Sequence, residues 1–154
     1  MTGFDDTLGA LRRLLLGIAT LGLIGIGVEL LLLGHFEDWW QFVPLLLIAG
    51  SLLSIAWHVL EKGRASLRAV QWTMGLCVVS GVLGMFLHYR GNTEFELEMM
   101  PGIEGVELFR NAITGATPAL APGAMIQLGL IGLAYAFRHP AWRAGRVARS
   151  NFRG

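Results

Sequence analysis

Four long apolar runs separated by polar stretches dominate the pattern of this 154-residue chain. A helix needs about 20 mostly apolar residues to cross a bilayer, whereas a membrane-barrel strand needs about 10 and alternates in polarity. The runs therefore predict an all-α integral membrane protein, a four-helix transmembrane bundle that forms a single domain over residues 1–154. The predicted spans are about 11–34, 39–60, 67–89 and 118–137, with an outer loop at 90–116 and a basic cytoplasmic tail at 138–154.

Two of the predicted helices carry recognisable start signals. Asp38, followed three residues later by Gln41, has the form of a capping box for the second span. Thr117 followed by Pro118 is typical of an N-cap and a first helical residue, so the fourth helix is expected to begin there.

The only long connection predicts two elements of its own. Residues Glu94–Met99 alternate between polar and apolar side chains, which predicts an extended segment. After Pro101, the apolar residues of 103–114 recur at helical spacing. We therefore expect a short amphipathic helix that lies on the outer surface or caps the bundle.

Charge predicts the orientation of the spans. Charged residues make up 15% of the chain, against about 25% in soluble proteins, which agrees with lipid as the surrounding solvent. Ten of the 12 Lys and Arg residues lie at the N-terminus, in the second connection or in the tail, and only Arg90 and Arg110 lie on the other side. Cytoplasmic loops are enriched in basic residues, so both termini are expected in the cytoplasm, an N-in/C-in topology.

Glu29 is the clearest candidate for chemistry, because an ionisable side chain inside an apolar span is costly and needs a reason. Gly22, Gly25 and Glu29 fall on one helix face, at spacings of three and four residues. Small residues on a spanning helix mark the place where another helix approaches closely. Glu29 is therefore expected to point into the bundle.

The third span has a similar face that ends in His88. Its members recur at spacings of four, three and four and are Cys77, Gly81, Gly84 and His88. Two such faces suggest that the first and third helices pack together, which would let Glu29 meet His88.

The role of Glu29 stays open between a proton or ion site and a structural polar anchor, whose partner would be the N-terminus of the fourth helix near Thr117. Gln127, midway along the fourth span, is interpreted as a residue that hydrogen-bonds between helices.

Metal and haem sites are further alternatives, although no cofactor is predicted. Imidazole and carboxylate groups bind divalent cations, and the set that could do so on the outer side is His35, Glu37 and Asp38. The histidines also fall into two pairs at two depths, as the axial ligands of a di-haem cytochrome would: His35 with His88, and His58 with His139. Against haem, His35 and His139 lie at or beyond helix ends, next to Gly34 and Pro140.

No nucleotide-binding, nucleophile or zinc-protease motif occurs, and no nucleic-acid partner is expected. Whether the chain is an enzyme is left open, with the absence of such motifs weighing against it. The single cysteine, Cys77, allows no intramolecular disulfide.

Two stretches resemble a family of small bacterial four-helix membrane proteins to which no activity is assigned. They are Glu29-Leu-Leu-Leu-Leu-Gly-His-Phe-Glu-Asp-Trp-Trp-Gln-Phe-Val-Pro44, and Gly115-Ala-Thr-Pro-Ala-Leu-Ala-Pro-Gly-Ala-Met-Ile-Gln-Leu-Gly129 with the later Arg138-His-Pro140. The resemblance covers about a quarter of the chain. It implies a bacterial origin and an inner-membrane location, and it carries no functional residues.

The leading expectation is an accessory or structural membrane protein that acts through helix–helix contacts, within a homo-oligomer or a larger membrane complex. The first alternative is a component of proton- or ion-linked transport that uses Glu29. The second is a redox protein that binds haem or a metal.

Overall fold

The computed structural model describes residues 2–115 and 117–142, and these residues form helices joined by turns, with no strand among them. Three helices are long and apolar enough to cross a membrane, which indicates a helical membrane protein. The rest of the predicted tail, residues 143–154, lies outside the described residues. The elements are α1 (Thr2–Leu32), η1 (Trp39–Gln41), α2 (Phe42–Glu61), α3 (Arg64–Met99), α4 (Gly105–Thr114) and α5 (Gly123–Ala136).

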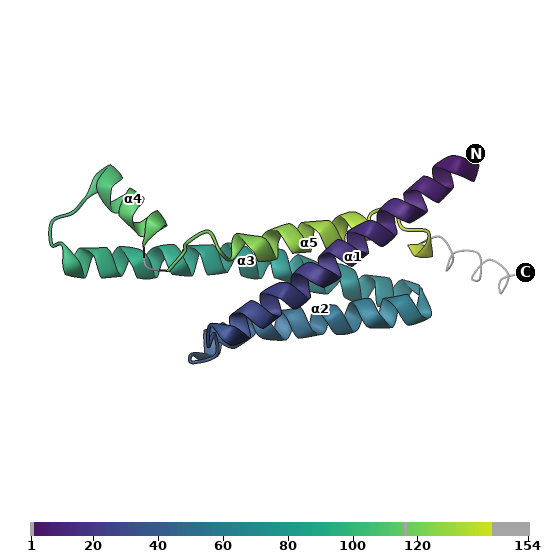
Figure 1. Cartoon of the computed structure of the whole chain (residues 1–154), viewed down its shortest axis with the longest axis horizontal. Coiled ribbons are helices and arrows are strands. Elements are labelled where there is room, and N and C mark those ends of the chain that lie inside the picture. The colour runs from purple at the N-terminus through teal and green to yellow at the C-terminus, as the bar shows by residue number, and fades with distance from the viewer. Residues whose placement is uncertain (1, 116, 143–154) are drawn as a thin grey trace, which may run out of the picture.

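The helices form an elongated bundle in which α3 is the central member (Figure 1). A two-residue turn, Lys62 and Gly63, folds α3 back against α2. Helix α5 lies along α3, and α1 crosses obliquely against α5 and α2. Helix α4 packs on the far part of α3, well away from the N-terminus of the chain.

The main core lies where α1, α2, α3 and α5 meet. Its fully buried side chains include Leu23 of α1 and Met74 of α3. Glycines let α5 approach α3 closely: a Cβ atom added at Gly129 would lie 2.6 Å from the carbonyl oxygen of Met74, closer than real Cβ contacts allow. Small residues at helix contacts are what membrane helices use to bring backbones together. The α3–α5 contact is therefore the tightest in the bundle.

The capping box predicted at Asp38 is present at the start of η1. The side-chain oxygen Oε1 of Gln41 accepts the backbone N–H groups of Glu37 at 2.8 Å and Asp38 at 3.3 Å. The first N–H groups of a helix have no partner within the helix. The Gln41 side chain supplies a partner for the N–H groups of Glu37 and Asp38, which directly precede η1.

The prediction of an extended segment at Glu94–Met99 is wrong, because α3 continues as a helix through Met99. Arg90 and Glu94, one turn apart, form an ion pair at 2.8 Å, and the Thr93 hydroxyl donates to the carbonyl of Tyr89. A six-residue alternation is short, and extending an existing helix adds a hydrogen bond for each residue ordered. The helix therefore persists, and α4 at Gly105–Thr114 follows it where a short helix was expected.

The predicted start of the fourth helix at Thr117 and Pro118 is also wrong, because α5 begins at Gly123 with Pro122 as its N-cap. Residues 118–122 form successive turns, in which the N–H groups of Ala121 and Gly123 bond carbonyls three residues back. Pro122 carries no N–H and restricts the residue before it, so the regular helix starts only after it.

Candidate functional site

Glu29 lies on the exposed surface of α1, so the expectation that it points into the bundle is wrong. The buried stripe of α1 is formed by Ala19, Leu23 and Gly27, spaced four residues apart. Glu29 lies about 120° around the helix from the middle of this stripe, at the 3.6 residues per turn of an α-helix. Of the predicted face, only Gly22 is close to a neighbour, the side chain of Leu128, whereas a Cβ added at Gly25 would meet nothing within 4 Å.

The predicted packing of the first helix on the third is wrong as well. Within the described residues, α1 contacts α5 and α2, and α3 contacts α2, α4 and α5. The small-residue face of α3 is a real contact face, but it meets other partners. Added Cβ atoms at Gly81 and Gly84 would collide with Pro122, and the sulfur of Cys77 lies 3.4 Å from the hydroxyl oxygen of Ser51 on α2.

His88 interacts with the turns before α5 rather than with Glu29. Its Nδ1–H donates to the carbonyl oxygen of Pro118 at 3.1 Å. One turn further along α3, the buried amide of Asn92 donates to the carbonyl oxygens of Ala112 and Thr117, at 2.8 and 2.6 Å, and accepts the Thr117 N–H. These two side chains fasten the connection between α4 and α5 to α3. We call this region the His88 end.

The candidate metal set is not assembled as a site. Among the described residues, no group of three or more histidine, cysteine, aspartate or glutamate side chains is placed to hold a metal ion. Glu37 and Asp38 are exposed and belong to the turn that precedes η1. His35 is half-buried, and its pKa is lowered first by burial and then by the nearby charge of His88.

The densest group of interacting ionisable and polar side chains lies at the opposite end of the bundle. We call this the Arg12 end and define it by Arg12, His58, Ser66, Tyr135 and His139. The rings of His58, Tyr135 and His139 pack in a triangle, with centroids 5.1–5.7 Å apart. A guanidinium nitrogen of Arg12 donates to the carbonyl oxygen of Arg138 at 3.3 Å. Four helices thus converge on one cluster.

Hydrogen bonds fix the proton positions on both histidines of this cluster. The Ser66 hydroxyl donates to the carbonyl of Gly63, so it can only accept from His58, whose Nδ1 lies 3.0 Å away. The Ala141 N–H donates to Nδ1 of His139 at 3.2 Å, so that nitrogen carries no proton and Nε2 does. Nδ1 of His58 therefore carries a proton, whereas Nδ1 of His139 does not.

Neutrality of His139 agrees with its surroundings. Burial, followed by the charges of His58 and Arg12, lowers the pKa of His139 from 6.5 to about 4. A proton added to Nδ1 would place two donors against each other at Ala141. The cluster is thus a contact that holds the ends of α1, α2, α3 and α5 together while His139 is uncharged.

The same geometry bears on the haem alternative. His58 and His139 are neighbours, as their predicted pairing requires, but their rings meet edge to face with centroids 5.3 Å apart. Two axial ligands bind opposite faces of a haem and need the macrocycle between them. As they lie, the two rings leave no space for it.

Other polar contacts line the junction of α2 and α3. The Ser54 hydroxyl lies 3.0 Å from that of Thr73, and His58 meets Ser66 one turn beyond. The side chains that hydrogen-bond between α2 and α3 include serine, threonine and histidine. Gln127, for which such a role was predicted, is exposed on α5.

Asn92 and the Arg12-end cluster were missed from the sequence, and each had a signal. Asn92 continues the spacing of the Cys77–His88 face by four residues, but it was assigned to a loop. Ser51, Ser54 and His58 recur at three and four residues on the second span. Such a polar stripe on an apolar helix predicts a helix contact.

No protein-family model, no curated protein and no solved structure matches this chain.

Proposed function

We propose that this chain is a four-span membrane protein that serves as an accessory subunit, with the surface of α1 around Glu29 as its contact with a further membrane helix. The observation that carries the proposal is the exposed carboxylate itself. Glu29 lies 16 residues beyond Arg13, or about 24 Å along the helix, within a hydrocarbon core of about 30 Å. A charged side chain at that depth faces protein or water, because contact with lipid tails is costly.

A fourth crossing by α5 is supported by how its first turns are held. With 14 residues, α5 is about 21 Å long and does not span the core alone. Non-helical backbone at membrane depth is tolerated where protein covers it and satisfies its polar groups. His88 and Asn92 do this for the turns that precede α5.

A bacterial inner membrane is proposed from the family resemblance of the sequence alone, whereas an N-in/C-in topology is also supported by the Arg12 end. Arg12 of α1 reaches the carbonyl of Arg138 just after α5, so these two segments lie at the same end of the bundle. The Lys62–Gly63 turn and its basic neighbours lie at the same end (Figure 1). The excess of basic residues assigns this end to the cytoplasm, and α4 then lies outside.

The test is the assembly state of the chain, extracted from its own membrane in mild detergent and measured by native mass spectrometry. We expect a complex larger than one chain, with Glu29→Leu weakening it about three- to thirtyfold, the range of a lost interhelical hydrogen bond. The matched control is Glu98→Leu, an exposed glutamate near the end of α3. A wild-type chain that is single both in detergent and after cross-linking in its native membrane would contradict the proposal.

Proton- or ion-linked transport is the second candidate, and the exposure of Glu29 also favours a form of it. A carboxylate on the outside of the chain can serve a pathway only at a boundary between subunits. Glu29→Gln separates the two functions: it keeps a hydrogen-bonding side chain but cannot be charged. Loss of proton flux in a pH-dye assay with the assembly intact would favour transport over the accessory role.

A further inference from the structure

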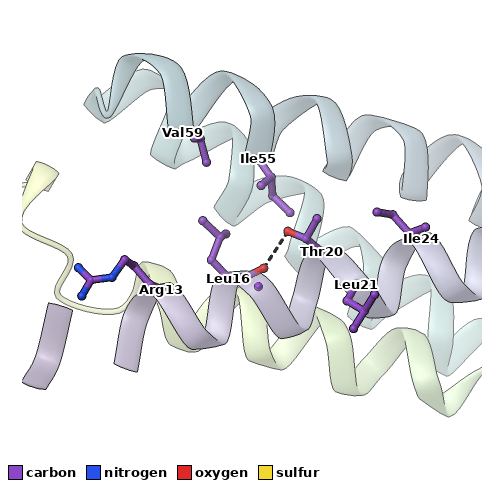
Figure 2. A pocket seen from close by; sticks show the side chains of 8 residues that line it. Arg13, Leu16, Thr20, Leu21, Ile24, Ile55 and Val59 are labelled. Atoms are coloured by element: carbon purple, nitrogen blue, oxygen red, sulfur yellow. Dashed lines mark hydrogen bonds between the residues drawn. The ribbon is translucent and has the colours of Figure 1, made fainter. Parts of the chain in front are cut away.

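An open groove runs between α1 and α2 near the Arg12 end (Figure 2). It has a volume of about 460 Å³, within the range of roughly 300–1,000 Å³ that is usual for small-molecule sites. Its apolar lining consists of Leu16, Gly17, Leu21 and Ile24 from α1, with Ile55 and Val59 from α2.

One end of the groove is charged. Arg13 lies at this end, and its side chain points back toward the N-terminus of α1, where Nη1 lies 3.6 Å from the position of a Cβ added at Gly9 (Figure 2). Among the residues that the structure describes, no acidic one lines the groove, and the one ion pair, Arg90 with Glu94, is elsewhere. The mouth of the groove is therefore positive without a partner of its own.

The interior of the groove has no side-chain group that needs a polar ligand. Thr20 is the only uncharged polar side chain in the lining, and its hydroxyl donates to the carbonyl of Leu16 at 2.8 Å (Figure 2). From Arg13 to Ile24 the groove extends 11 residues, or about 16 Å. This matches one leaflet, about half of the 30 Å hydrocarbon core.

From this charge, polarity and length, we propose that the groove binds an anionic phospholipid, with one acyl chain between α1 and α2 and the headgroup phosphate at Arg13. A guanidinium suits a phosphate because it offers several N–H donors in a plane. Gly17 leaves space for the acyl chain, because a side chain at this position would project into the groove. The inference needs α1 and α2 to span the membrane, but neither the contact at Glu29 nor the sidedness proposed above.

The experiment is a lipid titration of the purified full-length chain by native mass spectrometry, with phosphatidylglycerol and phosphatidylcholine of the same acyl chains. We expect the first phosphatidylglycerol to bind about fivefold more tightly than phosphatidylcholine, as one basic residue near an anionic headgroup predicts. Arg13→Gln should abolish this preference. Gly17→Leu should weaken both lipids at least fivefold, because it fills the space for the acyl chain.

Two controls make the result specific. Gly50→Leu adds the same side chain to α2 at a site outside the groove, and, as at Gly17, an added Cβ meets nothing within 4 Å. Lys62→Gln removes an exposed positive charge at the same end of the bundle. Both should bind like the wild type, and thermal unfolding should show all four variants folded.

The inference is overturned if Gly17→Leu binds phosphatidylglycerol as tightly as Gly50→Leu, or if Lys62→Gln loses as much preference as Arg13→Gln. The same spectra report the number of chains in each complex. Failure of lipid binding and failure of the proposed assembly are therefore read separately.

Discussion

Helices α5 and α1 are both apolar, but they differ in what surrounds them. Six of the 14 residues of α5 are buried, and its Gly129 lies against the backbone of α3. In α1, which has 31 residues, the buried residues among those described from Gly3 onward are Ala19, Leu23 and Gly27. Apolar composition thus identifies a helix suited to a membrane without saying whether protein or lipid covers it. The difference lies in where small and hydrogen-bonding residues meet a neighbour.

The largest expected effect tests the α5 side of this comparison. Gly129→Leu should destabilise the chain by about 3 kcal/mol, the upper part of the usual range for overpacking, because the new side chain meets the Met74 carbonyl and Val78. Unfolding in mixed detergent and SDS measures the free energy. Gly25→Leu on α1 is the matched control and should change it by less than about 0.5 kcal/mol. Equal effects of the two substitutions would remove the distinction between the helices.

A smaller loss is expected where α3 holds the turns before α5. Asn92→Leu should cost about 2 kcal/mol, since it leaves the buried carbonyl of Ala112 and both polar groups of Thr117 without their partner. Hydrogen exchange should show faster exchange in residues 117–122, while the amides of α1 keep their protection. An increase spread evenly over the whole bundle would mean that Asn92 supports the fold in general rather than this connection.

The pH dependence tests the other end of α5. The pKa of His139 in the folded chain, about 4, lies below its ordinary 6.5, so the unfolded chain binds the extra proton between these values. The stabilisation is complete above pH 6.5 and is lost as the pH falls toward 4. Melting temperature should therefore fall on acidification, and His139→Gln should flatten that fall. The fall in melting temperature of His35→Gln, a variant at the His88 end, is compared with that of His139→Gln, because the pKa of His35 is also lowered.

The smallest effect is expected on α1. Glu29→Gln should change the stability of the isolated chain by less than about 0.5 kcal/mol, because the side chain is exposed. His88→Ala, which removes the bond to the Pro118 carbonyl, should cost about 1 kcal/mol in the same assay. A large loss for Glu29→Gln would show that α1 depends on a contact within the chain.

The sequence predicted the long apolar helices and the capping box at Asp38 because these depend on local pattern. It also identified the face through Gly81 and Gly84 as a contact face, but not the partner. The spacing of small residues on one helix indicates that another element packs against that face, but it does not indicate which helix this is. The orientation of Glu29 was predicted wrongly for this reason: a Cβ added at Gly22 would contact Leu128, whereas one added at Gly25 would meet nothing within 4 Å.

The Arg12-end cluster could not be predicted as a unit. Its members range from Arg12 to His139 in the sequence, and the packing of α5 along α3 brings His139 to His58. Helix ends were equally hard to predict, since prolines delay α5 and side-chain pairs prolong α3.

Helix α3 is long enough to project well beyond the hydrocarbon core of a membrane. Its 36 residues measure about 54 Å, so an upright α3 rises about 24 Å above a 30 Å hydrocarbon core. Headgroups extend the bilayer to about 40–45 Å, so the acidic tip of such an α3 lies roughly 17 Å beyond them. This is about two Debye lengths of about 8 Å. Anything that recognises this tip would do so where the field of the headgroups is largely screened, at a height that deleting whole helical turns would lower step by step.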